Sequence, residues 1–211
     1  MQFRMARAEQ LRRAEWAVCL GATVAAIGLH VVYLTHAGGL WRDETNSIQI
    51  ATSATAGEVW RLWTGHLVHY NAGHLLWDLA VFVPAGMWLE AILPGLACRF
   101  YLLAPPAISA ALFVGEPGLV RYAGLSGLAT GVLVLLALVQ WRRDARAPRW
   151  FWPAVLALVA LKIGLEAFSA EPLLARFEPG VRVVTLAHVG GVACAIVAFV
   201  VRRLRSTPSH S

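Results

Sequence analysis

Two short motifs in the second half of the chain combine reactive side chains with glycines. GLSG centres on Ser126, and AHVGG places His188 ahead of two glycines. A serine hydroxyl is a weak nucleophile unless a neighbouring base takes its proton, and histidine is the usual base. The two motifs therefore predict a serine nucleophile activated by a histidine, provided that the fold brings them together.

A further pair of polar residues, His74 and Asp78, lies upstream in another apolar stretch. The two are four residues apart, so they share one face of a helix. Ionisable side chains within hydrocarbon are costly, which makes them candidates for a functional site by default.

The composition predicts the elements that must position these residues. The chain is 58% hydrophobic and 14% charged, whereas soluble domains carry about 25% charged residues. Six segments approach the roughly 20 apolar residues that cross a bilayer core. They lie at about 16–35, 69–91, 96–114, 122–141, 150–168 and 183–201. Within the third segment, Pro105 and Pro106 predict a kink or a break.

We therefore expect an all-α, polytopic membrane protein with a bundle of six transmembrane helices. The membrane domain is expected at 16–203, between tails at 1–15 and 204–211. Arginines concentrate in the N-terminal tail, at 142–149 and at 202–205, which predicts that both termini are cytoplasmic. The net charge of +6 is then explained by these stretches, and no nucleic-acid partner is expected. An alternative makes the first segment a cleaved signal peptide.

With this orientation, three polar side chains share one depth. Ser126, His188 and His74 each lie four or five residues inside a segment that starts on the outer side, or about 6–8 Å deep. Glycines after His188 favour a close helix crossing, which would bring Ser126 within reach of His188. The three widely spaced cysteines predict neither a disulfide framework nor a thiolate metal site.

These motifs resemble those of the rhomboid intramembrane serine proteases, and more narrowly the rhombosortase branch. The resemblance implies that Ser126 is the nucleophile, that His188 is the general base and that His74 helps to bind the oxyanion. The resemblance also implies that Gly124 and Leu125, which precede the serine, support that oxyanion site. The helix contact is implied to use Gly127, Gly191 and Ala195.

Upstream residues also match the family pattern. Trp60 and Arg61 resemble the tryptophan–arginine pair of the first loop, and His69 and His74 resemble the two histidines of the second span. Glu90 resembles the glutamate that closes that helix.

Two positions depart from the pattern. Asp78 stands where most rhomboids have an asparagine that binds the oxyanion, and an ionised carboxylate there would be repulsive. Burial could keep it neutral, or it could pair with His74, and we favour the pairing. Thr130 stands where many rhomboids have a tyrosine against the histidine.

The resemblance implies a serine-type intramembrane endopeptidase that needs no cofactor and no metal. It cleaves membrane-anchored proteins in or beside a transmembrane segment. For rhombosortases the implied substrates carry a C-terminal glycine-rich motif, a transmembrane helix and a basic tail. The implied location is the bacterial inner membrane, with the site near the periplasmic side.

Lys162 and Glu166 lie four apart in the fifth segment. An internal ion pair is one interpretation. The resemblance implies another, in which they belong to a substrate gate with the loop at 169–182.

Two alternatives remain open. A metal-dependent membrane hydrolase would use His66, His69, His74 and Asp78, although His69 and His74 are five apart and would diverge on a regular helix. A rhomboid-like protein without activity would bind membrane clients, but such proteins typically lack the serine or the histidine.

Overall fold

The computed structural model describes residues 59–69, 72–117, 119, 122, 124–169 and 184–206. Within these ranges the chain is helical and has no strand. The elements are α4 (Arg61–Thr64), the 3-10 helix η2 (Gly65–Leu67), α5 (Ala72–Ile92), α6 (Leu96–Gly115), α7 (Ser126–Arg143), α8 (Phe151–Ser169) and α9 (Thr185–Ser206). The predicted first span, and nearly all of the predicted loop at 169–182, lie outside the described residues.

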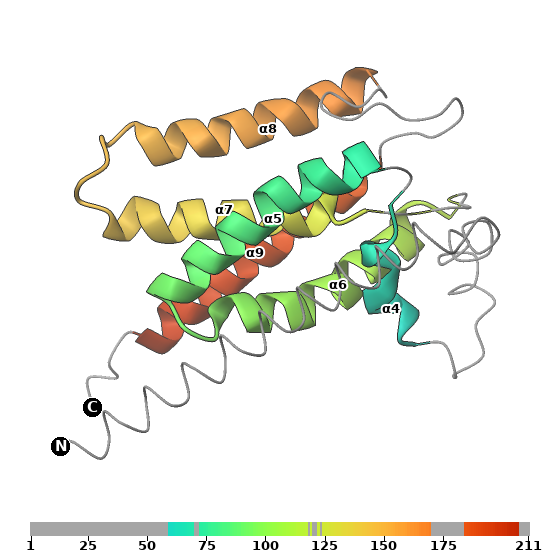
Figure 1. The fold of residues 1–211 in the computed structure, drawn as a ribbon, viewed down its shortest axis with the longest axis horizontal. Coiled ribbons are helices and arrows are strands. Elements are labelled where there is room, and N and C mark those ends of the chain that lie inside the picture. The colour runs from blue at the N-terminus through green and yellow to red at the C-terminus, as the bar shows by residue number, and fades with distance from the viewer. Residues whose placement is uncertain are drawn as a thin grey trace, which may run out of the picture.

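The central helix of the bundle is α7. It packs against α5, α6, α8 and α9, and most of its residues between Gly127 and Gln140 are buried. In Figure 1, α8 lies on one side of α7 and α6 on the other, whereas α5 and α9 run obliquely across the view of α7. A helix enclosed in this way can position side chains for several neighbours at once.

Four of the described helices, α5, α6, α8 and α9, are long and apolar enough to cross a membrane. The outer face of α8 is apolar, because Leu158, Leu161 and Phe168 are all exposed there. Such a wide apolar surface is favourable only when it faces hydrocarbon or a partner. The prediction of an all-helical integral membrane protein is confirmed for the described residues, whereas the count of six spans and the orientation stay predictions.

α7 is not among those four helices, and it also begins later than predicted. Its last residues include Gln140, Arg142 and Arg143, which lower its apolar character. The fourth segment was expected to enter the membrane near Tyr122, but the helix begins at Ser126. Ser126 therefore opens its helix and does not lie four residues inside it.

α6 runs through both prolines as one helix. Pro106 has no N–H, so the carbonyl oxygen of Leu102 lacks its usual partner four residues on. The indole Nε1 of Trp63 on α4 donates a hydrogen bond to that oxygen at 2.9 Å. The helix is therefore kept continuous by a neighbour that also fixes α4 against α6.

Glu90 joins the end of α5 to the start of α6. Its carboxylate is buried and accepts hydrogen bonds from the backbone N–H groups of Gly95 and Ala97, the latter at 3.1 Å. The first N–H groups of a helix have no partner within it, so a carboxylate at this position satisfies them. Glu90 thus fixes the turn between two helices that pack around α7.

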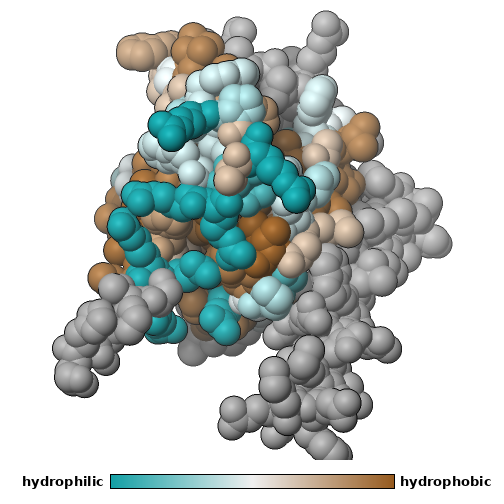
Figure 2. All heavy atoms as spheres, turned by 90° about the vertical axis from the view of Figure 1, so that its left-hand side faces the viewer, coloured by the Kyte–Doolittle hydropathy of each residue, from teal (hydrophilic) through white to brown (hydrophobic). Residues whose placement is uncertain are grey.

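Hydrophilic side chains gather at one end of the bundle. Figure 2 shows them over the end where α7 passes into α8 and where α9 ends. The basic residues there are Arg142, Arg143, Arg146, Arg149, Arg202, Arg203 and Arg205. The two described basic stretches thus lie at the same end of the molecule, opposite the start of α7.

Candidate active site

The loop before Ser126 depends on a glycine. Gly124 has a φ of 118°, a conformation that costs other residues strain. A side-chain carbon there would lie 2.7 Å from Cε1 of His74 and 3.4 Å from Oδ2 of Asp78. Only a residue without a side chain can follow this path, and the path holds the backbone directly before Ser126 against His74.

Ser126 is half-buried at the first position of α7. The N-cap is Leu125, and no side chain caps the helix. The first N–H groups of α7, beginning with that of Ser126, therefore remain available to an anion.

α7 and α9 touch through their backbones beside Ser126. A side-chain carbon at Gly127 would lie 2.7 Å from the carbonyl oxygen of Ala187, and one at Gly191 would overlap the carbonyl oxygen of Gly127. Gly131, one turn further along α7, lies against Gly191 in the same way, and Ala195 is fully buried. This crossing places the residue before Gly127 and the residue after Ala187 at the same level.

The residue after Ala187 is His188, which is 2% exposed. Its Nδ1 lies 3.1 Å from Oε2 of Glu166 on α8, but the carboxylate is off the axis of the N–H bond. Neither ring nitrogen makes an aligned hydrogen bond with a described residue. Nε2 of His188 is therefore a buried imidazole nitrogen that has no hydrogen-bond partner, Ser126 included, among the described residues.

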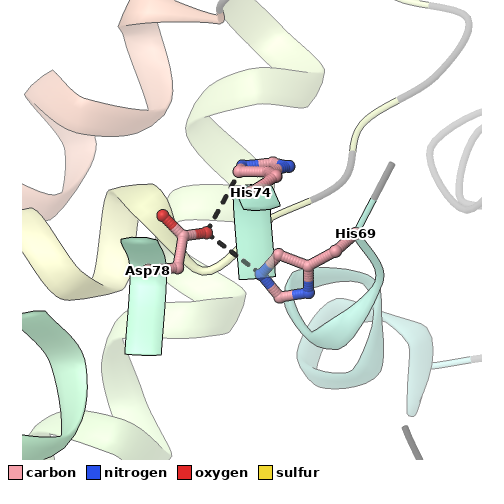
Figure 3. A group of neighbouring side chains, drawn as sticks. All are labelled: His69, His74 and Asp78. Atoms are coloured by element: carbon pink, nitrogen blue, oxygen red, sulfur yellow. Dashed lines mark hydrogen bonds and ion pairs between the residues drawn. The ribbon is translucent and has the colours of Figure 1, made fainter. Parts of the chain in front are cut away.

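A cluster of two histidines and an aspartate borders Gly124. Nε2 of His69 lies 3.0 Å from Oδ2 of Asp78, and Nε2 of His74 lies 3.4 Å from the same oxygen. Figure 3 shows the carboxylate between the two rings. The expectation that His69 and His74 diverge is wrong, because His69 lies before α5 and not on it.

The hydrogen bonds of His69 limit the charge of this cluster. Its Nδ1 lies 3.0 Å from the carbonyl oxygen of Leu67, which only accepts, so Nδ1 carries a proton. One more proton must then lie between Nε2 of His69 and Oδ2 of Asp78. The pair has no net charge whichever atom holds that proton, so Asp78 is not an uncompensated negative charge beside Ser126.

Leu125 contributes to the cluster through its backbone. Its N–H group lies 3.4 Å from Nε2 of His69 and donates to that nitrogen when the shared proton lies on Asp78. This N–H therefore faces the cluster, and Leu125 supports the loop before Ser126.

Three ligand atoms of the cluster, from His69, His74 and Asp78, lie within 4.8 Å of one another. Two imidazoles and a carboxylate are a donor set that zinc and iron accept, so these residues could hold a metal ion. His66 does not belong to this group. Its Nε2 faces the carbonyl oxygen of Pro105 at 3.1 Å and the hydroxyl of Ser109 at 3.0 Å.

His66 instead forms a polar network that the sequence analysis missed. The hydroxyl of Tyr122 lies 3.2 Å from Nδ1 of His66 and 3.2 Å from the carbonyl oxygen of Gly124. Burial lowers the pKa of His66 to about 4. The network links η2, α6 and the loop before Ser126. In the sequence, Tyr122, two residues before Gly124, was the feature from which this network could have been predicted.

The remaining predicted residues lie around this centre. The guanidinium of Arg61 stacks over the ring of Trp60, 4.8 Å from its centre. Thr130 is buried within α7. Lys162 and Glu166 form an ion pair of 2.7 Å, and their role in a gate stays a prediction.

Comparison with known families gives one match. The family model of the rhomboid domain matches residues 56–204, which include every described element except the last two residues of α9. Comparison with curated proteins and with solved structures found no match.

Proposed function

Because the chain belongs to the rhomboid family, whose members are in general intramembrane serine proteases, we propose that it is an intramembrane serine endopeptidase in which Ser126 is the nucleophile and His188 the base. The observation that carries this proposal is the backbone contact of Gly127 with Ala187 and Gly191. This contact sets the helices of Ser126 and His188 side by side, and Nε2 of His188 is buried without a hydrogen-bond partner in the described chain.

The proposed reaction has two steps. Nε2 of His188 takes the proton of the Ser126 hydroxyl while the oxygen attacks the peptide carbonyl. The amine leaves with that proton, and the new C-terminus stays on Ser126 as an ester. Water then attacks the ester, His188 again acting as base, and frees the acid and the hydroxyl.

The oxyanion of each step is proposed to lie at the start of α7. The N–H of Ser126 and the helix dipole favour negative charge there. His74, whose ring borders Gly124, is the second proposed donor. The zero net charge of the His69–Asp78 pair supports this assignment, because an isolated carboxylate at this position would repel the oxyanion.

The substrate proposal follows the rhombosortase resemblance. We propose membrane-anchored proteins with a glycine-rich motif, a transmembrane helix and a basic tail at the C-terminus. The protein would act in a bacterial inner membrane with its site near the periplasmic side. The exposed apolar surface of α8 supports a substrate class that lies in the bilayer.

The test is cleavage of such a tailed protein expressed together with the wild type, Ser126→Ala or His188→Ala. Each variant should lose at least about a thousandfold in rate, with unchanged expression and thermal unfolding. Mass spectrometry of the new C-terminus gives the cleaved bond. A fluorophosphonate probe should label the wild type at Ser126, and cleavage by Ser126→Ala would overturn the proposal.

A metal-dependent hydrolase is the second candidate, because the ligand atoms of His69, His74 and Asp78 lie so close together. It predicts that a chelator abolishes cleavage and that zinc restores it, while Ser126→Ala remains active. The serine mechanism predicts the opposite result in both measurements.

A further inference from the structure

Glu166 is a buried acidic residue in a helix whose other described residues are mostly apolar. The outward residues of α8 are apolar and exposed, among them Leu158 and Leu161, whereas Glu166 is 3% exposed. A carboxylate within the membrane is retained only when it is paired or functional. An ion pair with Lys162 alone would not require the carboxylate to be buried against another helix.

One oxygen of this carboxylate has two partners. Oε2 lies 2.7 Å from Nζ of Lys162 and 3.1 Å from Nδ1 of His188. Lys162, on the same helix, compensates the charge. The contact with His188 joins α8 to the residue that is the proposed base on α9.

The contact has a consequence for the imidazole. A carboxylate only accepts hydrogen bonds, so it selects the form of His188 that has its proton on Nδ1. Nε2 then carries a lone pair, and this buried nitrogen has no hydrogen-bond partner among the described residues. When His188 takes the serine proton, the carboxylate also stabilises the imidazolium.

We propose that Glu166 is a positioning residue for His188, which makes the site a Ser126–His188–Glu166 triad with Lys162 as the counter-charge of the carboxylate. Nδ1 of His188 and Oε2 of Glu166 are already 3.1 Å apart, which is within hydrogen-bond distance. His74 of α5 is a further ionisable group, whose charge interacts with that of His188. This inference rests on the proposed function.

The experiment compares steady-state cleavage by the wild type, Glu166→Gln, Glu166→Asp, Lys162→Met and the double variant Lys162→Met/Glu166→Gln. Glu166→Gln should lower kcat by about a hundredfold to a thousandfold and leave KM within about threefold. Glu166→Asp should recover at least about tenfold of that loss. Lys162→Met should lower kcat by only about tenfold.

The double variant separates positioning from a structural ion pair. If Glu166 serves only to pair with Lys162, removing both charges restores wild-type kcat, which overturns the proposal. If Glu166 positions His188, the double variant stays as slow as Glu166→Gln. Leu161→Ala, at an exposed position of the same helix, is the matched control and should keep wild-type kcat.

Ser126→Ala distinguishes this inference from the proposed function. An active Ser126→Ala protein overturns both. An inactive Ser126→Ala protein together with a fully active Glu166→Gln protein overturns only the triad and leaves a dyad. Thermal unfolding of each variant in the same detergent shows that it is folded, and Glu166→Asp provides the rescue if Glu166→Gln unfolds.

Discussion

Two of the helices that pack against α9 contact it near His188 in different ways. α7 approaches α9 through glycines, so that backbone lies on backbone at Gly127 and Gly191. α8 reaches α9 at His188 through the carboxylate of Glu166, and apart from Trp152 its other described side chains are at least partly exposed. The inner contact is fixed by main-chain geometry, whereas the outer contact depends on the charge and position of one side chain. The inner contact should therefore be sensitive to added volume, and the outer contact to changes of charge.

The largest effect is expected from adding volume to the inner contact. In Gly191→Val the new side chain overlaps the carbonyl group of Gly127, so α7 and α9 must separate. The free energy of unfolding should fall by about 2–4 kcal/mol, and cleavage should be lost. Thermal unfolding in detergent and a cleavage assay measure both.

Gly164 of α8 is the matched control, because nothing lies within 4 Å of a side-chain carbon added there. Gly164→Ala should leave cleavage unchanged and should not lower the free energy of unfolding. Equal damage from the two substitutions would contradict the distinction between the inner and outer contacts.

The next effect concerns the loop before Ser126. Gly124→Ala forces a side chain into a left-handed conformation, 2.7 Å from Cε1 of His74. Displacement of this loop should lower kcat by about a hundredfold, at a cost in stability of about 1–2 kcal/mol. Stopped-time cleavage assays and chemical unfolding measure the two quantities. Wild-type kcat in this variant would show that His74 does not need its present position.

A smaller effect tests the charge of the cluster. His69→Ala leaves the buried Asp78 without the partner that shares its proton, so kcat should fall by about tenfold to a hundredfold. Asp78→Asn in the same chain removes the charge and should recover most of the loss. The measurement is kcat for both single variants and for the double variant. A double variant no faster than His69→Ala would argue against proton sharing.

The smallest effect on cleavage is expected from substitution of His66, because this residue affects mainly the free energy of unfolding. Its pKa is about 4 in the folded chain and about 6.5 in the unfolded chain. The unfolded chain therefore binds more protons between these values, so stability rises with pH through this window and is lost as the pH falls toward 4. The full effect is about 3 kcal/mol. Unfolding from pH 4 to 7 should show this slope in the wild type, and a much flatter one in His66→Asn.

The sequence was sufficient for those features that depend on local pattern. Apolar length predicted the long helices to within a few residues, and the rhomboid resemblance was confirmed at the level of the family. The start of α7 was missed because the apolar composition extends upstream of Ser126 to Tyr122, whereas Gly124 has a positive φ and the helix begins only at Ser126.

Contacts between elements that are distant in the sequence could not be predicted from residue spacing. His69 was treated as part of a regular helix, so its pairing with Asp78 was not foreseen. Glu166 was assigned to an ion pair or a gate. Its contact with His188 was missed because it depends on which face of α8 packs against α9. Gly131 repeats the role of Gly127 one turn later, and its spacing of four could have revealed it.

The main-chain contact between Gly127 and Gly191 also bears on how such a protein can diverge. Because no side chain separates the two helices there, the distance between them does not depend on which residues occupy neighbouring positions. The lipid-facing residues can therefore change widely during evolution, provided that they stay apolar, without altering the spacing of Ser126 and His188. A few glycines preserve the geometry while the rest of the sequence drifts.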